Sequence, residues 1–186
     1  VMSKYPSLVI ASHQAAMNFS NLMYAFPLSI SSAMAIIISY EFGARRMNAV
    51  KSYSKLGRLT ALGFSIFTLI FLYFLRYDLA ELYGHEPDFL RMTAIFMTYS
   101  LFFQVADVFA APLQGILRGY KDTKVPFYLG VLTYWGITLP VGFLLEKVTG
   151  LGPYSYWIGL ITSLIVSGLC YQWRLNRIVK RYESQQ

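Results

Sequence analysis

Charge, cysteine and histidine are scarce in this sequence of 186 residues. Asp, Glu, Lys and Arg together supply only 13% of it, which is about half the share found in a soluble domain. So little polar surface cannot keep a folded chain of this length in water. The single cysteine, Cys170, excludes a disulfide framework and a cysteine-based zinc site.

Apolar residues take the place of the missing charge. They make up 56% of the sequence, and the mean hydropathy is +0.46. A membrane-spanning helix needs about 20 mostly apolar residues. Five segments satisfy this requirement, at residues 8–40, 56–75, 89–117, 125–145 and 154–173. The sequence therefore predicts an all-α integral membrane fold with five transmembrane helices, forming one unit over residues 1–186.

The connections between these segments differ in charge from one side to the other. Twelve of the sixteen basic residues lie on one side, around two of the connections and in the C-terminal tail. The other side holds Lys4 and three further basic residues, with five of the nine acids. Because Lys and Arg accumulate on the cytoplasmic side, we expect a multi-pass protein of the cell (inner) membrane. Its N-terminus should lie outside and its C-terminus in the cytoplasm.

The net charge of +7 does not predict a nucleic-acid partner, because the basic residues lie in short connections rather than on one continuous patch. An odd number of spans with an outside N-terminus is unusual for a protein without a signal peptide, and the first residue is Val1. The sequence is therefore expected to be a piece of a longer protein.

Asp107 is the one acidic residue inside a predicted span. It lies 16 residues after Arg91 and 11 before Arg118, or about 24 and 16 Å along a helix axis. An ionised carboxylate near the middle of the bilayer costs on the order of 3 kcal/mol. We therefore expect Asp107 to exchange a proton for a metal or organic cation. A structural carboxyl, protonated or paired with polar neighbours, is the alternative.

Asp107 belongs to a helix face that is polar or small along its whole length. The face consists of Ser100, Gln104, Asp107, Ala111, Gln114 and Arg118. A polar face of this length in a membrane helix points to a bundle interior or a water-filled cavity. We expect Gln104 to assist Asp107 in binding a cation and Gln114 to line the cavity.

A second polar stripe follows the first span. Its members are Gln14, Asn18, Asn21, Ala25, Ser29 and Ser32. Two roles are equally compatible with it: Asn18 and Asn21 line a cavity, or the stripe makes hydrogen bonds between helices. Tyr24, Tyr99 and Tyr134, with Phe103 and Trp135, offer π faces to an organic cation, although most aromatic residues in such a sequence must pack or face lipid.

Small residues at four-residue spacing predict close helix packing rather than chemistry. They occur in the second and fifth spans as Gly57/Ala61/Ser65 and Gly159/Ser163/Ser167. Gly115 and Gly119, at the inner end of the third span, are expected to ease a turn.

No catalytic constellation is visible in the sequence. There is no acid paired with a histidine in a span, no nucleophile elbow and no glycine-rich phosphate loop, so we expect neither an enzyme nor a cofactor. His13 and His85 have no second metal ligand at suitable spacing. Both are expected to be solvated or capping residues near the outer interface.

Three stretches of the sequence together resemble one transporter family. They are ASHQAAMNFSNLM at 11–23, ILRGYKDT at 116–123, and residues 152–160 with their Gly-Pro and Trp-Ile-Gly-Leu groups. In these motifs the sequence resembles the C-terminal lobe of multidrug and toxic compound extrusion transporters. It is most similar to the NorM-like branch, and the likeness covers nearly the whole chain.

The resemblance implies a fold of two six-helix lobes around a cavity that opens alternately to each side. This sequence would supply helices eight to twelve, whereas the N-terminal lobe and the first helix of this lobe would lie outside it. The implied activity is export of organic cations and amphipathic drugs in exchange for Na⁺ or H⁺. Asp107 matches the carboxylate of the family's cation site, as a Na⁺ ligand where sodium is the coupling ion, and Phe103 matches an aromatic residue one turn before it.

Two other functions remain open from the residues. A lipid-linked flippase of related architecture usually lines its cavity with several basic residues, whereas no Lys or Arg lies in the middle of a span here. A membrane module that binds or scaffolds a partner without transport would tolerate an apolar replacement of Asp107.

Overall fold

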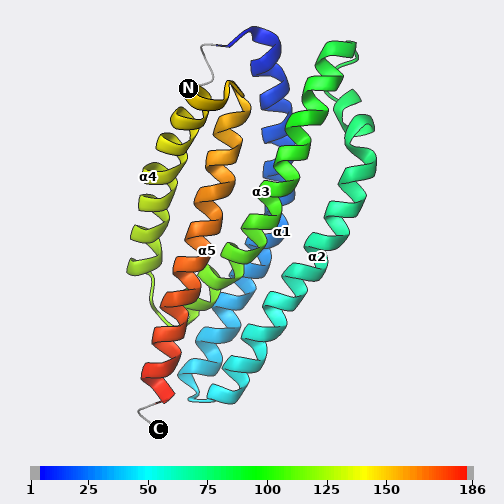
Figure 1. Cartoon of the computed structure of the whole chain (residues 1–186). Helices are drawn as coiled ribbons and strands as arrows, with labels where there is room; N and C mark the ends of the chain where they lie inside the picture. The colour runs from blue at the N-terminus through cyan, green and yellow to red at the C-terminus, as the bar shows by residue number, and fades with distance from the viewer. Residues whose placement is uncertain (1–4, 184–186) are drawn as a thin grey trace.

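The structure, a computed structural model, describes residues 5–183 of the chain, so Lys4 lies outside the described residues. This part of the chain forms five helices and contains no strand. The helices are α1 (Ser7–Gly43), α2 (Met47–Glu81), α3 (Pro87–Gly119), α4 (Lys124–Thr149) and α5 (Tyr154–Glu183) (Figure 1). Each is long and apolar enough to cross a membrane, which confirms the prediction of an all-α membrane protein.

Two of the helices continue well beyond the predicted spans. α2 begins at Met47, although the apolar segment begins near residue 56, and α5 continues to Glu183, although the apolar segment ends near residue 173. The additional turns carry many of the basic residues at one end of the molecule. Charged turns can remain helical outside the hydrocarbon, because each backbone group still finds its partner within the helix.

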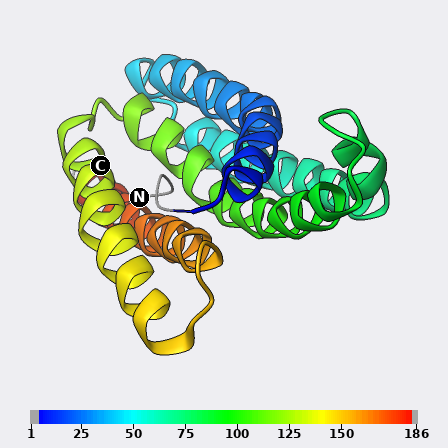
Figure 2. The same cartoon turned by 90° about the horizontal axis from the view of Figure 1, so that it is seen from above.

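Successive helices run in opposite directions, and the two ends of the described chain lie at opposite ends of the bundle (Figure 1). Seen from above, α4 and α5 form a pair beside the group of α1, α2 and α3 (Figure 2). α3 contacts α1, α2 and α5. In the most apolar 18-residue stretch of α3, 61% of the residues are buried, whereas 17% are buried in the corresponding stretch of α4. α3 is therefore the central helix of the bundle.

The apolar core is divided into two clusters along the bundle axis. One cluster lies toward the N-terminal end of α1 and is called the outer cluster here; it includes Phe19 of α1, Phe96 and Leu101 of α3, and Trp157 of α5. The inner cluster is made of the following residues: Met34, Ile38, Val50, Ala110, Leu113, Ile116, Leu117, Tyr120, Tyr171, Leu175 and Ile178. Asp107 lies on α3 between the two clusters, in a layer that is not apolar.

The inner halves of α1 and α3 approach each other closely. A Cβ added at Gly115 would lie 2.1 Å from the Ser31 carbonyl oxygen. The Ser31 hydroxyl donates a hydrogen bond to the Ala111 carbonyl at 2.6 Å and accepts one from Arg118 at 2.9 Å. Gly119 packs against Ile38 in the same way. The expectation that Gly115 and Gly119 ease a turn was therefore wrong: both lie inside α3 and make room for α1.

The other small-residue patterns have the predicted role. A Cβ at Gly57 would collide with the Met34 side chain of α1, and one at Gly159 would lie 2.6 Å from the Thr138 carbonyl of α4. The Ser167 hydroxyl of α5 makes a hydrogen bond with Thr133 of α4. These contacts confirm that the small residues of α2 and α5 serve close helix packing.

We predict that Gly115→Ala destabilises the bundle. The new methyl group has no room beside the Ser31 backbone, and overpacking of this kind costs about 1–3 kcal/mol. The thermal unfolding midpoint of the detergent-solubilised protein measures the effect. Gly136→Ala is the matched control, because nothing lies within 4 Å of that position, and it should leave the midpoint unchanged or raise it. Equal midpoints for both variants would show that α1 and α3 are not in close contact.

Candidate cation site

Asp107 is buried at the contact between α1 and α3. Only 6% of its surface is exposed, and its Oδ2 atom has no hydrogen-bond partner among the described residues. A buried, ionised oxygen without a partner is strongly unfavourable. This environment therefore favours a protonated carboxyl group, or a carboxylate whose charge is balanced by a cation.

Ser100, Gln104 and Asp107 share one face of α3, as the sequence predicts, and all three are buried. The Thr68 hydroxyl of α2 donates to backbone carbonyls of its own helix, Phe64 at 3.1 Å and Ser65 at 3.0 Å. Since its one proton is used there, Thr68 accepts from the Gln104 Nε2 group at 3.3 Å. This bond orients the Gln104 amide, so that its oxygen remains available as a ligand.

A small cavity joins Asp107 to α1. It is lined by Ser20, Met23, Tyr24, Pro27, Ser100, Phe103, Gln104 and Asp107. The space that the centre of a water-sized sphere can occupy is about 10 Å³, which is about the volume that one water molecule requires. The cavity therefore accommodates a monatomic cation or a water molecule, and it is far too small for a drug.

α1 supplies neutral oxygen atoms to this cavity. The Ser20 hydroxyl oxygen is buried and has no hydrogen-bond partner among the described residues. Pro27 lies inside the helix and has no N–H group, so it cannot bond to the Met23 carbonyl four residues earlier. The Met23 carbonyl therefore does not receive the usual helical hydrogen bond from residue 27. Met23 and Asp107 line the same cavity.

The chemistry of the cavity suits one small charge. Asp107 is its one ionisable carboxyl, and the hydroxyl and amide oxygens around it are neutral. No group of three or more His, Cys, Asp or Glu residues within the described chain can hold a metal ion. Oxygen ligands suit hard cations, and a single carboxylate balances a single positive charge. The site therefore fits a monovalent cation or a proton.

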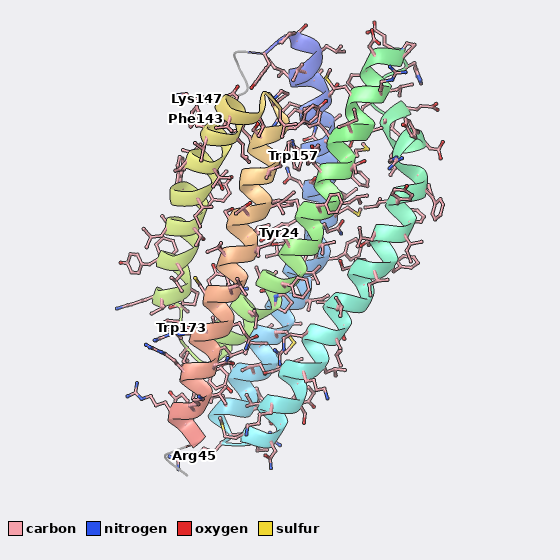
Figure 3. The ribbon with its side chains drawn as sticks, in the orientation of Figure 1. Tyr24, Arg45, Phe143, Lys147, Trp157 and Trp173 are labelled. Atoms are coloured by element: carbon pink, nitrogen blue, oxygen red, sulfur yellow. The ribbon has the colours of Figure 1, made fainter. Side chains whose placement is uncertain are left out.

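His13 does not have the solvated or capping role that was expected for it. Its Nδ1 atom accepts a hydrogen bond from the Trp157 indole at 3.2 Å. Its ring also packs edge-on against Phe96 and Trp157, at 5.7 Å in each case. Trp157 lies in the outer half of the bundle (Figure 3). α1 thus brings the half-buried His13 into contact with this aromatic cluster, whereas His85 is exposed as expected.

The remaining predicted residues do not gather around Asp107. Asn18 and Asn21 lie on the exposed face of α1, and Tyr134 is 52% exposed on α4. Tyr99 stacks on Tyr154 of α5 at 5.4 Å. Gln114 is half-buried and lies beside Tyr171. Of the aromatic candidates, Tyr24 and Phe103 line the cavity.

The sequence offered Tyr24 of α1 as a π face, but it gave no reason to select Ser20 of α1 or Thr68 of α2. Ser20, Met23, Tyr24 and Pro27 follow one face of α1, but that face is less polar than the neighbouring stripe. Thr68, which positions Gln104, stands in a run of apolar residues of α2. Pro27 was the available signal, because a proline inside a span frees a carbonyl one turn earlier.

Comparison with known proteins gives the family. The model of the MatE family matches residues 1–144. The chain belongs to the MatE family. It is 65% identical over 184 residues to the probable multidrug resistance protein NorM of Streptococcus pneumoniae strain R6, and 45% identical over 186 residues to the probable multidrug resistance protein NorM of Bacillus subtilis strain 168. These alignments cover 99% and 100% of this chain, and the chain spans about 41% of the length of each relative.

Membership of the MatE family agrees with the fold. MatE proteins are transporters rather than enzymes, and five candidate membrane spans fit a multi-pass membrane protein. A third relative, the probable multidrug resistance protein NorM of Halalkalibacterium halodurans, is 41% identical over 183 residues, covering 98% of this chain and 40% of the relative. The resemblance noted in the sequence motifs is thereby confirmed.

We predict that dicyclohexylcarbodiimide, an apolar reagent for protonated carboxyl groups, labels Asp107 in membranes. The group is buried away from water, so a reagent dissolved in lipid should reach it better than a water-soluble carbodiimide. Raising the pH should lower the labelling, because only the protonated acid reacts. Mass spectrometry of α3 peptides measures the modification, and Asp107→Asn is the blank. An α3 that stays unlabelled at every pH would contradict the buried, proton-accepting site.

Proposed function

We propose that this chain is part of a multidrug exporter that drives drugs out in exchange for Na⁺ or H⁺. The observation that carries the proposal is the buried Asp107 carboxyl, whose Oδ2 atom has no hydrogen-bond partner in the described chain and faces a cavity the size of one ion. The names of the relatives, which describe multidrug resistance proteins, support the drug as the exported substrate.

Coupling requires that proton and cation compete for one site. Asp107 is stabilised either by a proton or by a cation that Gln104 and Ser20 help to bind, and a cavity of this size holds one of them at a time. A bound ion shifts the balance between outward-open and inward-open states only if the two states bind it with different affinity. The site can make that difference because it is shared between α1 and α3.

The drug must travel along a different surface, since the Asp107 cavity is too small for it. The polar stripe of α1 supports such a path, because Gln14, Asn18, Asn21, Ser29 and Ser32 are all exposed on the described chain. Ser29 and Ser32 donate hydrogen bonds to carbonyls of their own helix, not to another helix. Contact of amide side chains with lipid hydrocarbon costs free energy. This face is therefore best explained as the lining of a water-filled passage.

The orientation is part of the proposal. Lys147, near the end of α4, and Arg45, in the connection after α1, lie at opposite ends of the bundle (Figure 3). The end that carries Arg45 holds the larger number of basic residues, which by the positive-inside rule belongs in the cytoplasm. The N-terminal end of α1 then lies outside.

Two alternatives are less well supported. A lipid-linked flippase would need cationic groups beside the cavity, but the cavity lining contains none among the described residues. A scaffold without transport activity would gain nothing from a buried carboxyl that lacks a partner, since burial without pairing destabilises the fold.

We predict that Asp107→Asn abolishes coupled drug export. The amide has almost the shape of the acid but cannot exchange a proton for a cation. Efflux of a fluorescent organic cation from cells that express the native-length gene product should fall to the level of cells without it. Asp88→Asn is the matched control, because Asp88 is exposed near the outer end of α3, and it should export normally. Normal export by Asp107→Asn would remove Asp107 from the mechanism and favour the scaffold.

A further inference from the structure

A basic pocket lies between α2 and α5 at the end of the bundle that carries most of the positive charge. Its polar and charged lining comes from Lys51, Ser54 and Arg58 of α2 and from Gln172, Asn176 and Lys180 of α5. The pocket has a volume of about 380 Å³, and no acidic side chain is among the described residues that line it. It therefore offers a concave, positively charged surface, and the Asp107 site does not use it.

Arg58 has unused capacity to bind an anion. Its Nε donates to the Ser54 carbonyl at 3.2 Å, and its Nη1 donates to the Gln172 side chain at 3.3 Å. Two of the five N–H groups of a guanidinium are thereby occupied, and the two bonds hold it between α2 and α5. The remaining N–H groups suit the paired oxygens of a phosphate group.

An apolar groove continues from this pocket along the bundle. It is lined by Leu59 and Leu62 of α2 and by Val108, Phe109 and Leu113 of α3. The groove has a volume of about 360 Å³. It adjoins the charged pocket, because Arg58 and Gln172 line both. Leu59 and Phe109 are 54% and 58% exposed. A ligand that fills both spaces needs an anionic head and an apolar tail.

The depth of the pocket matches the headgroup layer of a bilayer. Lys51 and Arg58 are seven residues apart, or about 10 Å along the helix, which is close to the roughly 5–8 Å of one headgroup region. Trp173, next to Gln172 on α5, is 52% exposed and lies under the Arg177 guanidinium at 3.9 Å from the ring centroid. Exposed tryptophan is typical of the membrane interface.

We propose that the basic pocket and the apolar groove together bind one anionic phospholipid of the leaflet at the basic end of the bundle. Its phosphate lies between Arg58 and Lys180, and an acyl chain follows the groove along Leu62 and Phe109. The charge of the pocket selects an anionic over a zwitterionic headgroup. The bound lipid bridges α2 and α5 at this end of the bundle, where an exposed hydrogen bond joins Arg58 to Gln172. This inference does not depend on the coupling ion.

Native mass spectrometry of the detergent-solubilised protein tests the headgroup selectivity. The probes are phosphatidylglycerol and phosphatidylcholine with identical acyl chains. The unmodified protein should retain phosphatidylglycerol preferentially. Arg58→Gln with Lys180→Gln should lower that preference roughly 30-fold, since each basic residue near the surface contributes about fivefold. Binding of phosphatidylcholine, whose headgroup has no net charge, should fall much less, and an unchanged thermal unfolding midpoint shows that the variant is folded.

The matched control removes two charges from the same end of the molecule but outside the pocket. Lys121→Gln with Lys124→Gln is suitable, because both residues are exposed around the connection between α3 and α4. This control should keep the preference within about twofold, because neither residue lines the pocket or the groove. If both double variants lose the preference for phosphatidylglycerol equally, the preference arises from general surface charge, and the proposed site is wrong. An unchanged preference in Arg58→Gln with Lys180→Gln would overturn it too.

Quenching of tryptophan fluorescence by brominated acyl chains tests the groove. Phe109→Trp is introduced while Trp135 and Trp173 are replaced by Phe, which leaves Trp157, whose side chain is 0% exposed. Brominated phosphatidylglycerol should quench the new tryptophan more strongly than brominated phosphatidylcholine at equal mole fraction. Arg58→Gln with Lys180→Gln should abolish the difference. Absence of quenching by either lipid would mean that a protein segment fills the groove, and the proposal would fail.

Discussion

A single carboxyl group, that of Asp107, is buried inside a bundle of helices that are long and apolar enough to span a membrane. An ion in hydrocarbon is costly, and Asp107 has no basic side chain in its cavity to pair with. A proton or a monovalent cation can neutralise it, but both cannot occupy a space of this size together. Because no basic side chain lies in the cavity, burial of the ionised carboxylate costs free energy. For the same reason, Asp107 binds one positive charge at a time.

The two apolar clusters lie on either side of Asp107 along the bundle. The outer cluster around Trp157 and the inner cluster around Ile116 close the bundle on either side of the Asp107 layer. α1 and α3 meet at both clusters and at the site between them, and their inner contact is tight, with Ser31 bonded to α3 on two sides. A change of charge at Asp107 thus acts on the contact between two helices rather than on a local loop. In the proposed mechanism, that contact is the element on which ion binding acts.

The parts of the structure that depend on one helix at a time could be predicted from the sequence. Apolar length predicted five spanning helices, and the spacing of Ser100, Gln104 and Asp107 predicted a common buried face. What depends on the register between helices could not be predicted. The lining from Ser20 and Pro27, and the bond from Gln104 to Thr68, require knowing where α1 and α2 cross α3.

The errors have the same origin. Gly115 and Gly119 seemed suited to a turn because they stand near a helix end, yet the approach of α1 decides their role. His13 was expected to be solvated or to cap a helix near the outer interface, but the Trp157 side chain that binds it comes from a helix 144 residues further along the chain. The exposure of Asn18 and Asn21 is no error, since a cavity lining was one of the two roles open to them, but it too depends on which face of α1 packs against α3. Periodicity identifies a polar face, and only packing decides whether it is buried.

The central claim is that Asp107 exchanges a proton for a cation. It is tested most directly by measuring proton release from the purified, native-length protein in weakly buffered detergent solution when Na⁺ or an organic cation is added. We expect the unmodified protein to release about one proton per chain, because a cation displaces a proton from its ligand. Asp107→Asn should release none. Equal proton release from both proteins would contradict it.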